Sequence, residues 1–534
     1  MPTESLPFRD TNYFSKLIFD YLDEKPELKD LYGHLPTIVN FKAQIEEKAK
    51  SESGHLDRSR KLLSQVLKKQ YEKVDASELT LQNIDDLKSE RTFTITTGHQ
   101  LNLFTGPLYF LYKIISTINL TKQLKAEYPE YNFVPIYWMA SEDHDFDEIN
   151  YFNFKGKKLL WNSNQTGAVG HFNLGGLEAV YEVISEEFGP GEHSEQLKQW
   201  FKKAYLEHDN LADATRYLAN AIFGKYGLVI IDADDSELKR LFIPHIEKDI
   251  FEQSSHDSVV KINKKLEDLG YGIQVNPRKI NFFYIHKGLR ERIVFENGVY
   301  GVLETDITWS ESELKQHIED HPERFSPNVI MRPMYQEVIL PNLCYIGGGG
   351  ELAYWFQLKQ NFEDHKVVFP ILLLRNSVLI KSEKQNKKLE KLNISTHDLF
   401  LKRESFINKK VRQISNIDIN FSDQKEHLIS QFEGLYDLAE KTDKSFIGAV
   451  KAQEVKQLKG LEHLEKRLLK AQKRKLADEV ERMTDLQEQL FPGQSLQERN
   501  TNFSELYLEY GDELVEKLIK ELDPLSGGFL IMTI

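Results

Sequence analysis

The stretch RTFTITTGHQLNLFTGPLYFLYKIISTINLTKQL, residues 91–124, decides the fold. It opens with β-branched residues that end at a glycine, and the periodicity of a helix follows at once. The same order recurs in NFVPIYWMA (132–140), YGLVIIDADD (226–235) and KVVFPILLLRNS (366–377), each an apolar run that ends in polar residues. Short apolar strands that alternate with helices are typical of a parallel sheet covered on both faces. The sequence therefore predicts an α/β fold, whose ligands bind beyond the carboxyl ends of the strands.

The chain is expected to fold as a core with additions before, within and after it. In chain order the expected parts are an N-terminal helical segment (1–90), the core (91–381), a helical coiled-coil domain (382–495) and a C-terminal segment that packs on the core (496–534). Two stretches, about 152–215 and 255–325, interrupt the alternation of strands and helices. They are interpreted as insertions, and INFFYIHKGLRERIVFENGVYG within the second predicts β-hairpins.

The segment from Thr442 to Leu490 predicts one long helix with a coiled-coil seam. It lacks proline, and its apolar residues recur mostly at spacings of three and four: Val455, Leu458, Leu461, Leu464, Leu468, Leu476, Val480, Met483 and Leu486. Thr442 and Asp443 resemble an N-terminal cap, and FPG at 491–493 ends the helix. At ~1.5 Å per residue the helix extends roughly 70 Å. It must therefore pack on another helix, either residues 422–440 or a second subunit, and we expect a homodimer.

Composition narrows the class of protein and its compartment. A single cysteine, Cys344, excludes a disulfide framework and a multi-thiolate zinc site, and fits a reducing cytoplasm. No apolar run reaches the roughly 18–20 residues of a membrane span, and the first residues do not resemble a secretion signal. The net charge of −14 disfavours a nucleic-acid partner. We expect a cytoplasmic protein that binds small molecules.

The first candidate site is the turn after the first core strand. Glycines let backbone approach a ligand, a helix start offers N–H groups to an anion, and neighbouring side chains add donors. The candidate binding positions are Gly98, His99, Gln100, Asn102, Thr105 and Gly106. The alternative is a tight strand-to-helix turn whose polar groups only cap the helix.

The second candidate site is the acidic string after the next strand, SEDHDFDEIN. Carboxylates beside a histidine can bind Mg²⁺, position an amine or raise the pKa of the imidazole. Asp143 and His144 stand directly at the strand end and, together with His99 of the first site, are the candidate catalytic residues. Asp147 and Glu148 are equally explained as acids at a helix N-terminus. Structural zinc is not expected, because no second histidine has a suitable spacing.

The third candidate site is RPMYQEVILPNLCYIGGGGELAYWFQLK, residues 332–359. Four glycines between a short strand and a helix suit a phosphate or carboxylate cradle, with Gly348 and Gly349 as binding positions. The run matches neither the Walker motif nor the dinucleotide fingerprint, so a plain loop is the alternative. Arg332 is a candidate for bidentate binding of carboxylates. Cys344 is interpreted as a buried, inert thiol.

Two further strand ends carry candidate ribose, phosphate or carboxylate contacts. They are Asp232, with Asp234, after LVIID, and Arg375, with Ser377, after the LLL strand. These residues are explained equally well as polar residues that end strands at the protein surface and contact no ligand.

Long strings in this order resemble the BshC family of bacillithiol biosynthesis. They are TGHQLNLFTGPLYFLYK, PIYWMASEDHDFDEIN, FGKYGLVIIDADD, FSPNVIMRPMYQEVILPNLCYIGGGGELAYWFQLK, DKSFIGAVKAQEVKQLKGLEHLEKRLLKAQKRK and LQERNTNF. The resemblance spans nearly the whole chain and is far more specific than any short motif. It implies a Rossmann-like core similar to class I aminoacyl-tRNA synthetases, with connecting-peptide insertions and a dimerising coiled coil.

The resemblance also implies an activity, that of a cysteine ligase. The family is held to join the carboxyl group of L-cysteine to the amine of glucosaminyl malate (GlcN-Mal), which gives bacillithiol. ATP with Mg²⁺ would activate the carboxyl group, and no tightly bound cofactor is expected. His99 occupies the place of the histidine-containing motif that handles ATP in those synthetases, and Arg375–Ser377 is the nearest match to their lysine-rich loop.

On this interpretation each candidate residue has a role. Backbone N–H groups near Gly98 and Gly106 stabilise developing negative charge. Asp143 or His144 orients or deprotonates the amine, and Arg332 pairs with the malate carboxylates. Two other functions stay open, a relic of a tRNA synthetase and a non-enzymatic, nucleotide-binding coiled-coil scaffold.

Overall fold

The computed structural model of the protein describes residues 3–52 and 56–534. These residues fall into two compact units, each described by itself below. The larger unit is formed by residues 3–379 and 497–531, and the smaller one mainly by residues 380–496. In the described part of the chain, each helix is too short or too polar to cross a lipid bilayer.

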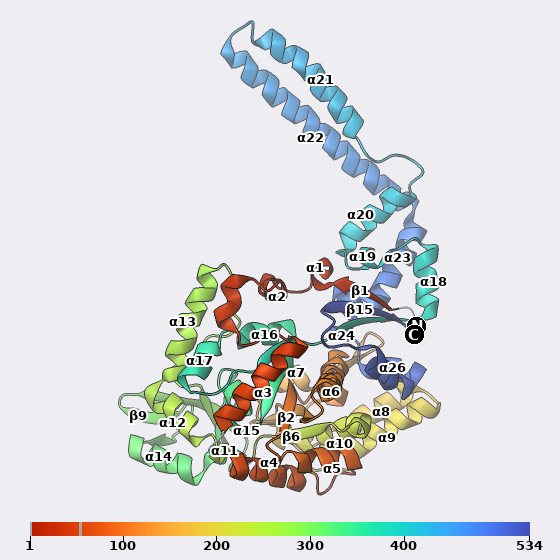
Figure 1. The fold of residues 1–534 in the computed structure, drawn as a ribbon. Helices are drawn as coiled ribbons and strands as arrows, with labels where there is room; N and C mark the ends of the chain where they lie inside the picture. Colours follow the sequence, from red (N-terminus) through yellow and green to blue (C-terminus); the bar gives the residue numbers. More distant parts are fainter. Residues whose placement is uncertain (1–2, 53–55) are drawn as a thin grey trace. The chain divides into compact units, whose positions relative to one another are not determined.

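Five parallel strands form the central sheet of the larger unit (Figure 1). Their order across the sheet is β13-β12-β2-β3-β6. In chain order the strands are β2 (Thr92–His99), β3 (Asn132–Met139), β6 (Val229–Asp232), β12 (Asn342–Gly347) and β13 (Ile371–Leu374). The sheet grows outward from β2 to β6 and then restarts on the other side of β2. This is the Rossmann order, and it confirms the predicted parallel α/β core.

Two helices, α3 (Ile38–Glu52) and α6 (Tyr109–Glu127), pack on one face of this sheet. Their apolar side chains join those of β2 in a single buried cluster, which includes Phe41, Ile45, Phe93, Ile95, Leu120 and Leu124. Burying side chains of this size contributes about 1.5–3 kcal/mol each. The packing fixes the first half of β2 relative to the last turns of α6.

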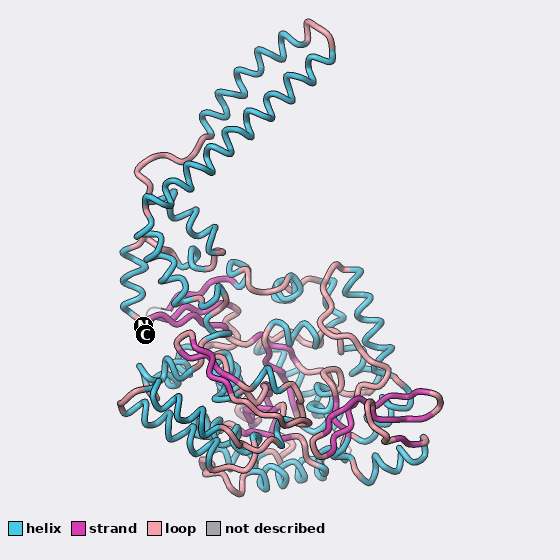
Figure 2. The backbone as a smooth tube through the Cα atoms, turned by 180° about the vertical axis from the view of Figure 1, so that it is seen from behind, coloured by secondary structure: helices cyan, strands magenta, loops and turns pink. Residues whose placement is uncertain are grey.

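The two stretches predicted as insertions lie within the larger unit. Between β3 and β6 lie a hairpin and a helical group, which are β4 (Tyr151–Phe154), β5 (Lys157–Leu160), α8 (Leu177–Phe188), α9 (Glu192–Leu206) and α10 (Leu211–Phe223). Between β6 and β12 lies an antiparallel sheet in the order β10-β9-β8-β7-β11. Its strands are β7 (Phe282–His286), β8 (Leu289–Glu296), β9 (Val299–Val302), β10 (Thr308–Trp309) and β11 (Phe325–Pro327). The predicted hairpins are therefore present (Figure 2).

The smaller unit is mainly helical, and its long helix is interrupted. Asp443 caps α22 (Lys444–Lys475) by accepting a hydrogen bond from the Ser445 amide at 2.7 Å, as predicted. The prediction of one helix as far as Leu490 is wrong, because the backbone of Leu476 (φ −104°, ψ 31°) leaves the helical region. Leu476 packs against a buried cluster, and a new helix, α23 (Ala477–Leu490), begins after it.

Helix α22 packs on a helix of its own chain. It runs antiparallel to α21 (Ser422–Ala439), as both views show (Figures 1 and 2). Phe432 and Val450 are buried between the two helices. This contact uses the first of the two predicted partners. Val455 and Leu464, which belong to the predicted seam, keep 42% and 53% of their surface exposed. The homodimer remains a prediction.

Candidate functional site

A cavity of about 690 Å³ lies at the carboxyl ends of β2, β3 and β12. Gly98 and His99 of β2 and Met139 of β3 line it, together with the glycines that follow β12. The strand order reverses between β2 and β12, so the chain leaves these two strands toward opposite sides of the sheet. Such a reversal opens a crevice where ligands of α/β proteins bind, and the volume suits a small-molecule site.

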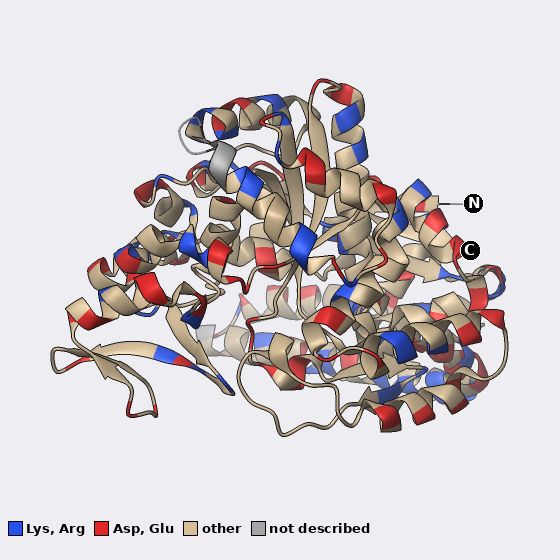
Figure 3. Cartoon of the chain, turned by 90° about the horizontal axis from the view of Figure 1, so that it is seen from below, with Lys and Arg blue, Asp and Glu red and all other residues tan. Residues whose placement is uncertain are grey.

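The cavity concentrates positive charge in an acidic protein. In the described part of the chain, the cations that line it are Lys113, Arg278, Arg290, Arg292, Arg332, Arg375 and Arg499, and the carboxylates are Glu142, Asp143 and Glu351. Outside, residues of both signs are interspersed along the surrounding helices (Figure 3). Clefts lined by one sign of charge attract ligands of the other sign. The cavity therefore suits a ligand with several negative charges.

Arg332 offers this cavity a hydrogen-bond donor that lacks a partner. It begins α15 (Arg332–Ile339), and its guanidinium lies near the rings of Trp138 and Tyr345. One nitrogen, Nη1, donates to Gln336 at 3.1 Å. The other, Nη2, is buried and meets no hydrogen-bond acceptor among the described residues in good geometry, although the guanidinium also interacts with the hydroxyl of Tyr354. Leaving a buried donor unpaired costs about 1–3 kcal/mol. A carboxylate or phosphate of a ligand would supply the missing acceptor.

The glycine run is occupied by a carboxylate of the chain itself. Glu351, in the first turn of α16 (Gly349–Trp355), accepts hydrogen bonds from the Gly348 amide at 2.8 Å and from Tyr345 at 2.7 Å. Lys113 donates to the same carboxylate at 2.7 Å and also to the carbonyl of Gly98. Burial raises the pKa of Glu351, but Lys113 outweighs burial and holds it below its usual value. The cradle predicted at Gly348 for an external anion is thus filled from within.

The remaining glycines of the run differ in the space that their surroundings leave for a side chain. Gly349 packs against Phe14 and Ile18, where an added Cβ would make contacts at 3.4 Å. At Gly347 a Cβ would lie 2.9 Å from the ring of Tyr345 and 3.1 Å from Cβ of Glu351. At Gly350 a Cβ would meet no described atom within 4 Å.

We therefore expect opposite results from two alanine substitutions. Gly347→Ala should lower the free energy of unfolding by about 1–3 kcal/mol, because Tyr345 and Glu351 must move apart. Gly350→Ala should leave it unchanged or raise it slightly, because alanine is the better helix former. Urea unfolding measures both. Equal stabilities would show that the glycine run is not held as described.

Asp143 is fixed as an anion at the carboxyl end of β3. Its carboxylate accepts hydrogen bonds from Gln100 at 2.5 Å and from the His144 amide at 2.7 Å, and Arg290 lies 3.9 Å away. Burial raises the pKa of Asp143, but the hydrogen bond from Gln100 and the charge of Arg290 outweigh it and hold the pKa below its usual value. A carboxylate fixed in this way binds a cation well and is a weak base.

His144 is oriented by Arg290, which donates to its Nδ1. A guanidinium only donates hydrogen bonds, so Nδ1 must accept and the proton of the neutral imidazole lies on Nε2. Arg290 itself stacks on the ring of Phe283 at 4.1 Å. His144 lines the cavity, and in this arrangement its Nε2 is a hydrogen-bond donor.

His99 is a neutral, buried side chain. Burial lowers its pKa to about 3, the nearby charge of Lys113 adds to the effect, and the backbone of Thr105 hydrogen-bonds to the ring. Its Nε2 has no hydrogen-bond partner among the described residues. An imidazole with so low a pKa is a poor proton acceptor at neutral pH. A binding role therefore suits His99 better than the predicted catalytic one.

The structure does not bring Asn102, Thr105 and Gly106 to the cavity. Asn102 donates to the carbonyl of Glu148 at 3.1 Å, and the amide of Gly106 donates to Leu103 at 3.0 Å. Gly106 needs its freedom for a turn at φ +64°, where an added Cβ would clash with Asn102 at 2.6 Å. That these positions bind a ligand stays a prediction, and Thr105 Oγ1 is buried without a hydrogen-bond partner among the described residues. Helix α6 begins after Leu108 without a side-chain cap, so these polar groups do not cap the helix.

Asp232 and Ser377 do not line the cavity, and the guanidinium of Arg375 is paired with a carboxylate of the protein. Asp232 accepts a hydrogen bond from Ser141 at 2.5 Å and from the Asp234 amide at 3.1 Å, so it shapes the loop after β6.

Arg375 reaches the cavity, but its guanidinium forms a buried ion pair with Glu498 at 2.7 Å. Ser377 donates to the same carboxylate at 3.2 Å. Both residues hold the segment around Glu498 rather than offering groups to a ligand.

Sequence reasoning missed three central residues of this cavity as site candidates, namely Lys113, Arg290 and Glu351. Lys113 is the last residue of the string TGHQLNLFTGPLYFLYK, yet in a helix pattern it looks like a solvent-exposed residue. Arg290 lies in the second insertion, far in sequence from the residues it contacts. Glu351 stands three residues after Gly348, which is the spacing of a capping box and the signal that could have found it.

The residues of the cavity fit a phosphate-bearing ligand better than a resident metal ion. Among the described residues no group of three or more His, Cys, Asp or Glu side chains could hold a metal ion. Magnesium is commonly held by one or two carboxylates together with substrate phosphates. A magnesium ion in this cavity would therefore need oxygens of a bound ligand as well as carboxylates of the protein.

Comparison with known proteins identifies the family. Residues 1–376 match the family model "Bacillithiol biosynthesis BshC, N-terminal Rossmann-like domain", and residues 378–534 match "Bacillithiol biosynthesis BshC, C-terminal coiled-coil domain". A solved structure of Mycobacterium tuberculosis methionyl-tRNA synthetase in complex with methionyl-adenylate aligns over 80% of this chain and 91% of that one, with 10% identity. Its TM-score of 0.22 is too low to carry an argument.

Curated relatives match along the whole chain. The protein of Christiangramia forsetii is 62% identical over 100% of this chain and 99% of its own. That of Flavobacterium johnsoniae is 57% identical over 100% of both chains, and that of Cytophaga hutchinsonii is 39% identical over 98% of this chain and 97% of its own. All three carry a provisional name as cysteine ligase BshC. The Rossmann-order sheet, the family models and these identities together establish that the chain belongs to the BshC family of bacillithiol biosynthesis.

Proposed function

We propose that the protein is a cysteine ligase that joins the carboxyl group of L-cysteine to the amine of GlcN-Mal and so forms bacillithiol. The observation that carries the proposal is the cationic cavity with its unpaired, buried Arg332 donor. GlcN-Mal brings two carboxylates and an amine, and ATP brings several phosphates. The family name of the relatives supports the same chemistry.

The malate part of the substrate is proposed to bind at Arg332. Its guanidinium has one nitrogen without a partner and lies between two aromatic rings, which limits its rotation. A planar guanidinium that is already positioned binds a carboxylate in bidentate geometry at little cost in entropy. Arg278, Arg292 and Arg499 also line the cavity and can attract the other negative charges.

The amine of the sugar is proposed to bind at Asp143. This carboxylate is held ionised and in one orientation by Gln100 and by the His144 amide. An ammonium group at hydrogen-bond distance would therefore be oriented without rearrangement of the protein. His144, with its proton on Nε2, would donate a hydrogen bond to an oxygen of either substrate.

The cysteine carboxylate needs activation, because a free carboxylate does not react with an amine. ATP with Mg²⁺ would supply this activation by adenylation. This chain contributes two kinds of group. Its cations attract the phosphates, and the backbone amide groups beside Gly98 lie where negative charge would develop, near Lys113. The proposal includes no tightly bound cofactor. It also retains a cytoplasmic homodimer, joined through the helical hairpin, as a prediction.

We expect Arg332→Gln to raise the KM for GlcN-Mal by about 10- to 100-fold, since each charge-assisted hydrogen bond contributes about 1.5–3 kcal/mol. The KM for cysteine should change little. Bacillithiol formation at varied GlcN-Mal concentrations, followed by mass spectrometry, measures both constants. Arg332→Lys is the informative control, because it keeps the charge and loses the planar fork. A KM for GlcN-Mal unchanged in both variants would remove Arg332 from the substrate site.

A further inference from the structure

Glu142 is a cavity carboxylate to which the proposed mechanism gives no role. We propose that the Glu142 carboxylate accepts the proton that the substrate amine must lose before the amide bond forms. This inference rests on the proposed function and adds a catalytic residue to it.

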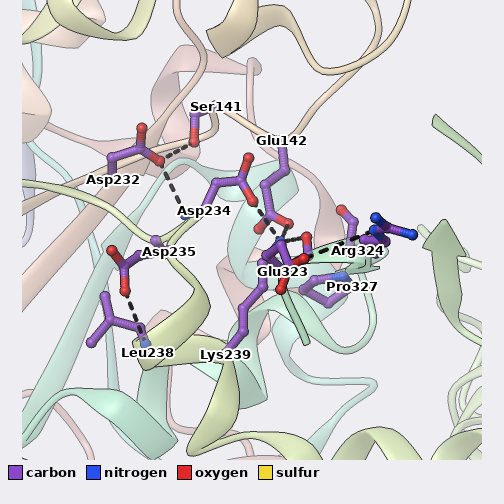
Figure 4. Close-up of polar contacts among 12 residues, drawn as sticks. Ser141, Glu142, Asp232, Asp234, Asp235, Leu238, Lys239, Glu323, Arg324 and Pro327 are labelled. Atoms are coloured by element: carbon purple, nitrogen blue, oxygen red, sulfur yellow. Dashed lines mark hydrogen bonds and ion pairs between the residues drawn. The ribbon is translucent and has the colours of Figure 1, made fainter. Parts of the chain in front are cut away.

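The position of Glu142 places a carboxylate in the cavity wall beside the expected amine site. Glu142 precedes Asp143 in the loop after β3, and its side chain is 12% exposed. Its Oε1 lies 2.6 Å from Nζ of Lys239, a residue of α11 (Ser236–Arg240). The side chain of Lys239 is 1% exposed. The same ammonium lies 2.6 Å from Oδ1 of Asp234 (Figure 4). Two carboxylates therefore share one lysine.

The other two carboxylates of the cavity are stabilised as anions. Asp143 accepts hydrogen bonds from Gln100 and from the His144 amide, and Glu351 accepts them from Lys113, Tyr345 and the Gly348 amide. Within the described residues the one ion pair of Glu142 is with Lys239, which Asp234 also uses. Glu142 is thus the cavity carboxylate whose negative charge is least compensated.

The surroundings of Glu142 suit a group that exchanges a proton near neutral pH. Burial raises its pKa to about 7, with Lys239 opposing the rise and Asp234 adding to it. A general base is most effective when its pKa lies near the working pH. The charged or titratable groups that face Glu142 from neighbouring elements are Lys239 of α11, Asp234 of the loop after β6, Arg290 of β8 and Tyr335 of α15.

His171 connects this cluster to solvent. Its Nε2 lies 2.8 Å from Oδ2 of Asp234, and its side chain is 60% exposed. The hydrogen bond to Asp234 raises the pKa of His171. Protonated His171 neutralises part of the charge of Asp234 and leaves more of the Lys239 charge to Glu142. The charge on Asp234 and His171 therefore tunes the basicity of Glu142 without either residue touching substrate, so both are positioning residues.

The proton transfer balances as follows. An N–H bond of the substrate ammonium breaks, its electron pair stays on nitrogen, and an O–H bond forms on Glu142. The neutral amine then attacks the activated cysteinyl carbonyl carbon. The second proton leaves the nitrogen for solvent as the adduct collapses and the activating group departs. Glu142 returns its proton to water before the next turnover.

The test is the pH dependence of kcat at saturating substrates. We expect Glu142→Gln to lower kcat by about 10²- to 10⁴-fold while the affinity for GlcN-Mal, measured by calorimetry, changes little. Glu148→Gln is the matched control, because this carboxylate belongs to the same acidic string and does not line the cavity. Thermal unfolding verifies that each variant is folded.

Two further variants should move the acid limb of the profile in opposite directions. Asp234→Asn removes a like charge, lowers the pKa of Glu142 and should move the limb to lower pH by about one pH unit. His171→Asn removes a cation next to Asp234 and should move it slightly to higher pH. The substrate amine also titrates, but it is the same in every variant, so these displacements report on the protein.

The possible outcomes separate this inference from the proposed function. If the unaltered protein forms no bacillithiol, the proposed function fails and the inference with it. If the unaltered protein forms bacillithiol and Glu142→Gln has the same kcat and the same acid limb of the pH profile, the inference alone is wrong. If Glu142→Gln does not fold, the shift in Asp234→Asn decides, and an unmoved limb there overturns the inference.

Discussion

Replacing Lys113 with methionine should lower the free energy of unfolding by about 3–5 kcal/mol, which is the usual result of breaking a buried ion pair from one side. Lys113 is buried and joins Glu351 to the carbonyl of Gly98. It therefore connects the carboxyl end of β2 with the glycine run after β12. Methionine keeps the length and apolar stem of the side chain, so the loss reports on the charge.

The double variant Lys113→Met/Glu351→Gln is the control for this prediction. It removes both charges and should recover most of the lost stability, because no buried charge is left without a partner. The single variant should also depend on pH. Without Lys113 the pKa of Glu351 in the folded state rises above its unfolded value, so the loss is small at low pH and grows as the pH rises through the unfolded value. Urea unfolding between pH 4 and 8 measures this. A constant loss would contradict the assigned pair.

Asp143→Asn should lower kcat for bacillithiol formation by about 10²- to 10³-fold and depress turnover far more than it depresses folding. Asparagine has the same shape, but it carries no charge for the substrate ammonium and its amide repels the amide of Gln100. Losses of this size are typical when an interaction that orients a reacting group is removed.

The measurement for Asp143 combines kinetics with unfolding. Mass-spectrometric rates give kcat, and thermal unfolding shows that the fold is intact. Gln100→Glu is the companion variant, because a second carboxylate beside Asp143 raises its pKa and should also impair turnover. Unchanged turnover in Asp143→Asn would remove this residue from the mechanism and leave Glu142 as the carboxylate to examine.

The sequence predicted the fold well because its signals are local. Apolar runs that end in polar residues identified the strands, and the quoted strings identified the family, which the family models confirm. The prediction of one long helix failed at one residue. Leu476 fits the apolar spacing, but it packs into a tertiary cluster that bends its backbone, and no helical pattern predicts such a contact.

The site was predicted less well because its interactions are long-range. Gly98 and Asp143 were chosen from strand ends and do line the cavity, since strand ends meet at one edge of a parallel sheet. Arg332, chosen as a carboxylate binder in the third string, lines it as well. The same rule also selected Asp232 and Ser377, whose side chains serve neighbouring loops. Glu351 filled the glycine run from within, and Arg290 came from an insertion, so neither could be found by examining strand ends alone.

The most direct test of the central claim follows oxygen from cysteine whose carboxyl group carries ¹⁸O. Purified protein is incubated with this cysteine, GlcN-Mal, ATP and Mg²⁺, beside a tube without ATP, and the products are weighed by mass spectrometry. We predict bacillithiol in the first tube only, together with AMP that carries one ¹⁸O from the activated carboxyl group. ADP together with inorganic phosphate that carries the ¹⁸O would confirm a ligase that activates cysteine as an acyl phosphate, not as an adenylate. A folded protein that forms no bacillithiol in either tube would contradict the proposed function.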